Sequence, residues 1–206
     1  IIAWPGLAWA KRMFPDLAEG DAQTRLAEAI FMASRVNAED PVASWKTHNQ
    51  RLKEKREWLN QKDFKEIHFK GPGTDLKVGL ADDHEWMGGA SMAQNGVVCN
   101  PNIPSEEVFT TPHAQRVEGY VSSTKPLSHQ GTLIDNIRVV FEKGSITDAK
   151  ASKGETVLKK VLESDEGARR LGEVALVPNS SPISNSGLLF YNTLFDENAA
   201  CHIALG

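Results

Sequence analysis

The spacing of the apolar residues changes near residue 60, and this change constrains the fold more strongly than any other feature of the sequence. Before residue 60, apolar residues recur every three to four positions, as in Leu26 and Ile30, which is the period of a helix with one buried face. After it, apolar and polar residues alternate, as in Leu76 and Val78, which is typical of a half-buried strand. Helices followed by strands predict an α+β protein.

The first 60 residues are predicted to be helical. Asp21 is expected to cap one helix. Asp40 followed by Pro41 is expected to begin another, because proline lacks the N–H group that would be left unpaired in the first turn. A stripe of every seventh residue then faces inward, and a run of mixed charges at 53–57 faces water. The stripe consists of Trp45, Leu52 and Leu59, with Val42 and Asn49 in the same row.

Residues 61–206 are predicted to form a strand-rich domain with one inserted helix. A Gly-Pro-Gly-Thr-Asp turn at 71–75 separates two alternating runs, which indicates a hairpin. The further expected elements are strands at 117–121, 137–141 and 145–149, and an amphipathic helix at 155–163 that Gly167 stops.

Composition excludes several classes of partner. The formal charge is −4, and no basic stripe with interleaved aromatic residues offers a path for phosphates, so we expect no nucleic-acid partner. No apolar run approaches the roughly 18 residues of a membrane span, and no signal peptide is recognisable. We therefore expect a cytoplasmic protein without a membrane partner.

The two cysteines and the chain ends give two further expectations. Cys99 and Cys201 are far apart and lack a C-x-x-C partner, so we expect two small buried side chains and no zinc knuckle. The chain begins at Ile1 and ends at Gly206 on an apolar run. We expect it to be cut from a longer protein.

Glu173 is the first candidate for chemistry, because it lies in an otherwise apolar strand. An unpaired carboxylate there would cost several kcal/mol or lose its charge. A divalent cation shared with His202 would compensate it, since a carboxylate and an imidazole suit zinc, cobalt or manganese. A buried salt bridge to Arg169 or Arg170, or exposure on an edge strand, would do so equally. Composition alone favours these structural alternatives.

Glu106 and Glu107 form the second candidate. Neighbours on extended backbone face opposite ways, so one could bind a metal while the other takes a proton from metal-bound water. Alternatively, both could be solvated in a turn, or lie in the first turn of a helix after Pro104 and Ser105. Spacing alone leaves these alternatives open. Asp196 and Glu197 are expected to begin a short helix.

Three segments carry a resemblance to a known family. They are 102–112 (NIPSEEVFTTP), 172–178 (GEVALVP) and 192–206 (NTLFDENAACHIALG). In order and spacing they resemble the aminopeptidase T/aminopeptidase S family of metal-dependent aminopeptidases. The resemblance extends through Trp45, 71–76 and 124–127, and so covers nearly the whole chain.

The resemblance implies a domain division and a set of ligands. Residues 1–60 would be the helical end of an N-terminal α/β domain. Residues 61–206 would be a metal-binding catalytic domain, incomplete at its C-terminus because family members take a Tyr and a His-x-Asp pair from beyond the last segment. The implied metal ligands in this chain are Glu107, Glu173 and His202.

The resemblance also implies a reaction. Two divalent metal ions (zinc, cobalt, manganese or magnesium) would activate a water that removes N-terminal amino acids from peptides. Glu106 is the candidate general base, because it is adjacent in sequence to an implied ligand. A homodimer is implied as well. On these expectations the full-length protein is a metalloaminopeptidase, and this piece alone is inactive. The alternative is a catalytically incomplete fragment or binding module that keeps the family scaffold.

Overall fold

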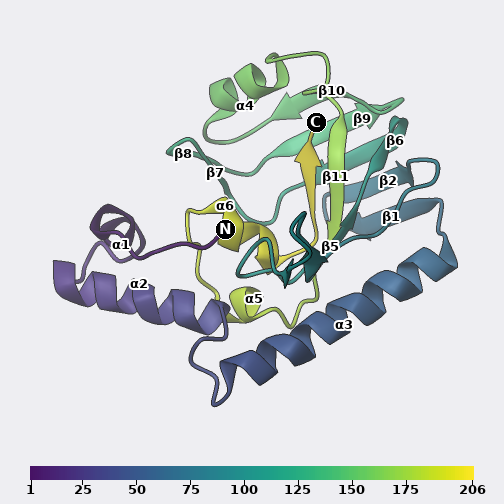
Figure 1. Ribbon diagram of the computed structural model, residues 1–206. Coiled ribbons are helices and arrows are strands. Elements are labelled where there is room, and N and C mark those ends of the chain that lie inside the picture. Colours follow the sequence, from purple (N-terminus) through teal and green to yellow (C-terminus); the bar gives the residue numbers. More distant parts are fainter. The chain divides into compact units, whose positions relative to one another are not determined.

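The computed structural model describes residues 1–206, which fold into two compact units that interleave along the sequence. The first consists of Ile1–Arg56, Gly88–Val108 and Leu176–Cys201, and the second of Glu57–Met87, Phe109–Ala175 and His202–Gly206. Helices and antiparallel sheets are mixed, which confirms the predicted α+β class (Figure 1). The domain boundary expected at residue 60 stays a prediction.

The first unit is built mainly from helices. They are α1 (Leu7–Met13), α2 (Glu19–Ala33), most of α3 (Pro41–Lys62), α5 (Pro182–Ser186), α6 (Thr193–Asp196) and the 3-10 helix η1 (Glu197–Ala199). A short hairpin of β3 (Ser91–Met92) and β4 (Val98–Cys99) completes it.

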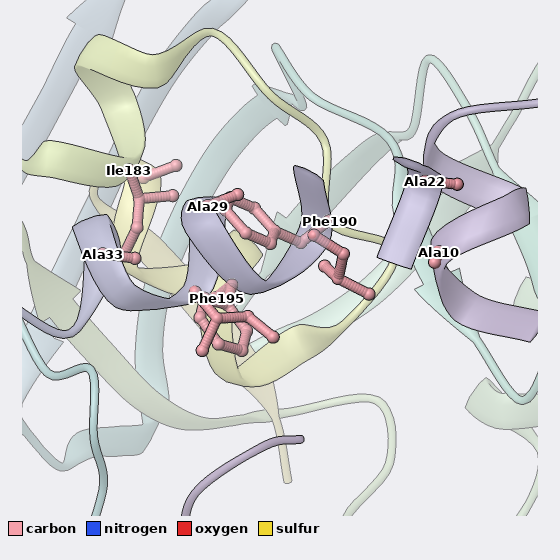
Figure 2. Packing of buried hydrophobic residues seen from close by; sticks show 10 residues of the cluster. Ala10, Ala22, Ala29, Ala33, Ile183, Phe190 and Phe195 are labelled. Carbon is pink, nitrogen blue, oxygen red and sulfur yellow. The ribbon is translucent and has the colours of Figure 1, made fainter. Parts of the chain in front are cut away.

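The core of this unit joins segments that lie far apart in the sequence. Alanines on α1 and α2 leave room for Ile183, Phe190 and Phe195, which are fully buried (Figure 2). The rings of Phe190 and Phe195 stack with centroids 4.7 Å apart. The small residues are therefore part of the packing, since aromatic rings fill the space that they leave. The cluster consists of Ala10, Ala22, Leu26, Ala29, Ile30, Ala33, Ile183, Phe190, Phe195 and Ala199.

The N-terminus of α3 forms as predicted, whereas that of α2 does not. The Asp40 carboxylate accepts a hydrogen bond from the N–H of Ala43 at 2.9 Å, so it caps α3. Helix α2 begins two residues before Asp21, which lies in its first turn. Asp21 is therefore not the cap of α2, but as an acid in the first turn it interacts favourably with the helix dipole.

The stripe on α3 is buried only in part. Leu52 and Leu59 are buried, as expected, whereas Val42 is 65% exposed. Val42 lies in the first turn, before the buried face of the helix begins.

The second unit contains a five-stranded antiparallel sheet with the order β1-β2-β6-β9-β10. The predicted hairpin at 71–75 joins the first two strands, and the other predicted strands are also present. The strands are β1 (Glu66–Gly71), β2 (Thr74–Leu80), β6 (Pro112–Ser122), β9 (Arg138–Glu142) and β10 (Ser145–Lys150). A glycine is required at 119, where φ is +106° and an added Cβ would lie 2.1 Å from the carbonyl oxygen of Asp75.

The remaining elements of this unit include the strands that position the candidate site. Strands β5 (Val108–Thr110), β11 (Leu171–Leu176) and β12 (His202–Leu205) form a three-stranded sheet with β11 in the centre. Strands β7 (Leu127–His129) and β8 (Thr132–Ile134) form a hairpin. Helix α4 (Glu155–Leu162) buries Leu158 and Leu162, and it ends five residues before the predicted stop at Gly167.

Candidate metal centre

Glu173 and His202 lie on the same face of neighbouring strands. In the antiparallel pair of β11 and β12, His202 is opposite Ala175, and Glu173 is two residues along the strand from Ala175. Side chains two residues apart on a strand point the same way, so Glu173 is the diagonal neighbour of His202. The Glu173 carboxylate and His202 Nε2 are 3.5 Å apart.

Glu107 brings a third potential ligand to this face. It directly precedes β5, which is part of the same three-stranded sheet, and it is only 7% exposed. One ligand atom from each of Glu107, Glu173 and His202 lies within 4.8 Å of the other two. Glu173 is on β11, His202 is on β12, and Glu107 directly precedes β5. The sheet thus brings the three residues together, although Glu107 and Glu173 are 66 positions apart in sequence.

This donor set fits a divalent metal ion. Two carboxylate oxygens and one imidazole nitrogen are ligands that zinc, cobalt and manganese accept. Ligand atoms about 2.1 Å from a common ion lie roughly 3.4 Å apart in a tetrahedral site, which is compatible with ligand atoms that all lie within 4.8 Å of one another. The three residues are therefore suited to hold an ion together.

The arginines that could have neutralised Glu173 have other partners. Arg169 Nη1 donates to the carbonyl oxygen of Ile146 at 3.3 Å, and Arg170 donates to the carbonyl oxygen of Ala114. Glu173 is instead paired with His202.

Glu106 points to a different set of partners from Glu107. Its two carboxylate oxygens accept hydrogen bonds from Arg35 Nη1 and Nη2 at 2.5 and 2.9 Å. Its side chain is 3% exposed, and His48 Nε2 lies 3.7 Å from the same carboxylate. The adjacent glutamates thus face different groups, as expected for neighbours on extended backbone, and they do not lie in a helix.

His48 is held as a neutral imidazole beside this ion pair. Nε2 donates to the carbonyl oxygen of Ser105 at 2.7 Å, which leaves Nδ1 as the acceptor for Arg35 Nη2 at 3.3 Å. Burial lowers the pKa of His48, and the nearby Arg35 and Arg51 lower it further, whereas Glu106 and the Ser105 carbonyl act in the opposite direction. The lowered pKa agrees with the neutral tautomer that these contacts require.

Arg35, His48 and Asn198 were not predicted from the sequence. The Asn198 side-chain oxygen accepts a hydrogen bond from the N–H of Glu106 at 2.6 Å. One of the three carried a usable signal, since His48 lies three residues after Trp45 and four before Leu52, on the buried side of α3. A polar residue on such a face needs a partner.

The expectation that both cysteines are buried is wrong. Cys99 and Cys201 are exposed and not buried. Cys99 lies on a two-stranded hairpin whose burial pattern is exposed throughout, and the Cys201 thiol contacts only the backbone of Val177 at hydrogen-bond distance.

A short helix does begin at Asp196 and Glu197, as expected, because Asp196 is the N-cap residue of η1 (Glu197–Ala199), which directly follows α6. The Asp196 carboxylate accepts hydrogen bonds from the N–H groups of Phe190 and Asn192, so this acid closes the loop before α6.

Comparison with known proteins decides the family. The model of a family described as thermophilic metalloprotease (M29) matches residues 1–206. The chain belongs to this family. The candidate ligands Glu107, Glu173 and His202 therefore gather in a chain that matches M29 metalloproteases over its whole length.

Individual M29 relatives agree with this assignment. The chain is 56% identical over 204 residues to aminopeptidase T of Thermus thermophilus, 50% identical to aminopeptidase 2 of Geobacillus stearothermophilus, and 48% identical to aminopeptidase AmpS of Bacillus subtilis. A solved structure titled wild-type AmpT from Thermus thermophilus superposes with a TM-score of 0.91 at 54% identity.

The matches cover 99–100% of this chain and 50% of each of these relatives, so the chain spans about half their length.

Proposed function

We propose that the protein containing this chain is a metal-dependent aminopeptidase that releases N-terminal amino acids from peptides. The observation that carries the proposal is the gathering of Glu107, Glu173 and His202 within 4.8 Å in a chain of the M29 metalloprotease family. A binding module without activity is not favoured, because the relatives at 48–56% identity are named aminopeptidases.

In this proposal Glu107, Glu173 and His202 hold metal ions. A bound divalent ion would polarise the scissile carbonyl group and lower the pKa of a bound water to about 7. His202 coordinates as the neutral imidazole, and the two carboxylates offset the charge of the metal. Two ions per site need more than three side chains, so the proposal includes further ligands outside these 206 residues. Zinc, cobalt, manganese and magnesium all fit the donor set.

Glu106 is proposed as the general base. Its place next to Glu107 supports the role, because proximity to the attacking water is the first requirement for a base. Its carboxylate is held by Arg35 and His48. To accept a proton at the metal centre, it would have to exchange one of the hydrogen bonds from Arg35 for one from the water.

The remaining parts of the proposal concern the whole protein. We propose a homodimer located in the cytoplasm, in which residues 1–60 end an N-terminal α/β domain and residues 61–206 belong to the catalytic domain. Each helix of the structure is too short or too polar to be a membrane span.

Peptidase assays on the full-length protein test the proposal. We expect release of leucine from a chromogenic leucyl substrate to stop when a chelator is added and to return with zinc or cobalt. Glu173→Gln should abolish this activity and weaken metal binding, because it removes one of the three charged or basic ligands. Glu166→Gln is the matched control, since Glu166 is exposed and is not among the gathered ligands.

The results can contradict the proposal at two levels. Activity that survives complete removal of metal would exclude metal catalysis altogether. Activity that requires metal but is unchanged in Glu173→Gln would leave the enzyme class intact and refute the assigned ligand set.

A further inference from the structure

Arg35 has an unusual backbone conformation. Helix α2 ends in two hydrogen bonds, from Val36 N–H to the carbonyl of Phe31 and from Arg35 N–H to that of Met32, which together form a Schellman motif. Arg35 occupies the left-handed position of this motif, with φ of +59°. Glycine is the usual residue there, because a side chain makes the left-handed region less favourable. An arginine at this position suggests that its side chain is needed.

The side chain of Arg35 makes three contacts at once. Its guanidinium group binds both carboxylate oxygens of Glu106 in a two-pronged ion pair. Nη2 also reaches His48 Nδ1, and the group lies 5.4 Å from the ring centre of Trp45. The Trp45 indole in turn donates to the carbonyl oxygen of Ser34, at the end of α2. The aromatic ring and the helix end therefore hold the arginine in place.

Residues 105 and 106 are held by three separate elements of the first unit. Arg35, just after α2, binds the side chain of Glu106, and His48 on α3 binds the carbonyl oxygen of Ser105. Asn198 in η1 accepts from the N–H of Glu106. Asn198 is itself fixed by two hydrogen bonds. Its side-chain amide donates to the carbonyl oxygen of Leu194, and its backbone carbonyl oxygen accepts from the Ser181 hydroxyl group. The backbone is thus fixed immediately before Glu107.

We propose that Arg35 is a positioning residue for Glu107. By holding Glu106 it fixes the direction in which the next side chain leaves the backbone, so that the Glu107 carboxylate is placed for metal binding before a metal arrives. Preorganised ligands bind more tightly because less freedom is lost on binding. This inference rests on the proposed role of Glu107 as a metal ligand.

Metal affinity of the full-length protein is the measurement that tests it. Zinc dissociation constants are obtained by competition with a chelating indicator dye, and thermal unfolding of the metal-free protein verifies the fold. We expect Arg35→Gly to weaken zinc binding at least tenfold, although glycine suits the backbone at this position. Arg35→Lys keeps the charge but loses the two-pronged geometry, so it should fall between wild type and Arg35→Gly. Arg25→Ala removes an exposed arginine of α2 as a control and should bind like wild type.

A double variant separates positioning from stability. Arg35→Gly alone leaves Glu106 buried without its partner, which could weaken the fold in general. Combining it with Glu106→Gln removes this charge and should restore the unfolding temperature. If Arg35 positions Glu107, zinc binding stays at least tenfold weaker in the double variant. Recovery of wild-type affinity there would show a purely structural role and overturn the inference.

The zinc affinity of a Glu107→Ala variant shows whether Glu107 is a metal ligand at all. If this variant loses zinc binding while both Arg35 variants keep wild-type affinity, only the positioning role is refuted. If Glu107→Ala binds zinc like wild type, the proposed ligand set is wrong and the inference falls with it.

Discussion

His48 links the stability of the chain to pH. Burial lowers its pKa in the folded state, against an ordinary value near 6.5, and Arg35 and Arg51 add to this effect while Glu106 opposes it. Above about pH 6.5 His48 is neutral in both states. As the pH falls below that value, the unfolded chain binds a proton that folded His48 resists, so stability is lost until the pH reaches the lower folded pKa.

We therefore predict that the His48→Gln variant loses less stability than wild type when the pH falls from 7.5 to 5.5. Glutamine can still donate to the carbonyl of Ser105 but does not titrate. Urea unfolding midpoints at several pH values measure the effect. Parallel curves for the two proteins would show that another group is responsible.

Glu106 is the residue whose proposed role is most open to a direct test. If it is the general base, Glu106→Gln should reduce kcat about 10²–10⁴-fold even when zinc is supplied in excess, so that weaker metal binding does not limit the rate. Metal analysis of the purified variant, together with kcat and KM for a leucyl substrate, would check this. A variant that keeps its metal and full turnover would remove Glu106 from the chemistry and leave it as the partner of Arg35.

The N-terminus of α3 is capped by the side chain of Asp40. The Asp40 carboxylate accepts from the N–H of Ala43, and the helix it begins carries both His48 and the buried Leu52. We predict that Asp40→Ala lowers the free energy of unfolding by about 1 kcal/mol. Glu39→Ala, an exposed neighbour outside the helix, should change it by less than about 0.5 kcal/mol. Equal effects of the two changes would contradict a capping role.

The core between α2 and α6 should be far more sensitive. Phe195 is fully buried, stacks on Phe190 and contacts the ring of Trp9 with centroids 5.8 Å apart. Phe195→Ala is predicted to cost about 3–5 kcal/mol, from lost burial and the cavity that remains. Phe31→Ala is the matched control, because Phe31 on α2 is 38% exposed. Chemical denaturation of both variants would measure the difference, and a similar cost for the two would contradict this account.

The sequence predicted elements better than it predicted contacts. Hydrophobic period and the Gly-Pro-Gly-Thr-Asp turn were enough for β1 and β2, because both signals are local. The set of three ligands came from the family resemblance, and the register of β11 and β12, in which Glu173 is two residues from the partner of His202, shows why Glu173 and His202 meet. Arg35 could not be predicted, since its partner Glu106 is 71 residues away and nothing in its neighbourhood marks the pairing.

At the scale of the whole molecule, the interleaved units make truncation informative. The first unit takes Ile183, Phe190 and Phe195 from its last segment, Leu176–Cys201. We predict that a chain ending at residue 175 leaves the apolar face of α2 uncovered, so that it aggregates or loses helical circular dichroism. Inserting a few residues after Asn95, in the exposed turn between β3 and β4, should be tolerated. A soluble shortened chain with full helical signal would contradict the importance of the late segment.

The core residues of α2 and those of the segment 183–199 are far apart in sequence, so this core can form only late in synthesis of the chain. Ala33 and Ala199 belong to the same core, so the ribosome must add 166 further residues (199 minus 33) before that core can close. At about 5–20 residues per second this takes roughly 8–33 s. During that interval the inner face of α2 lacks the side chains that will cover it. A nascent chain of this family should therefore depend on chaperones that shield apolar surface, until its last helices emerge.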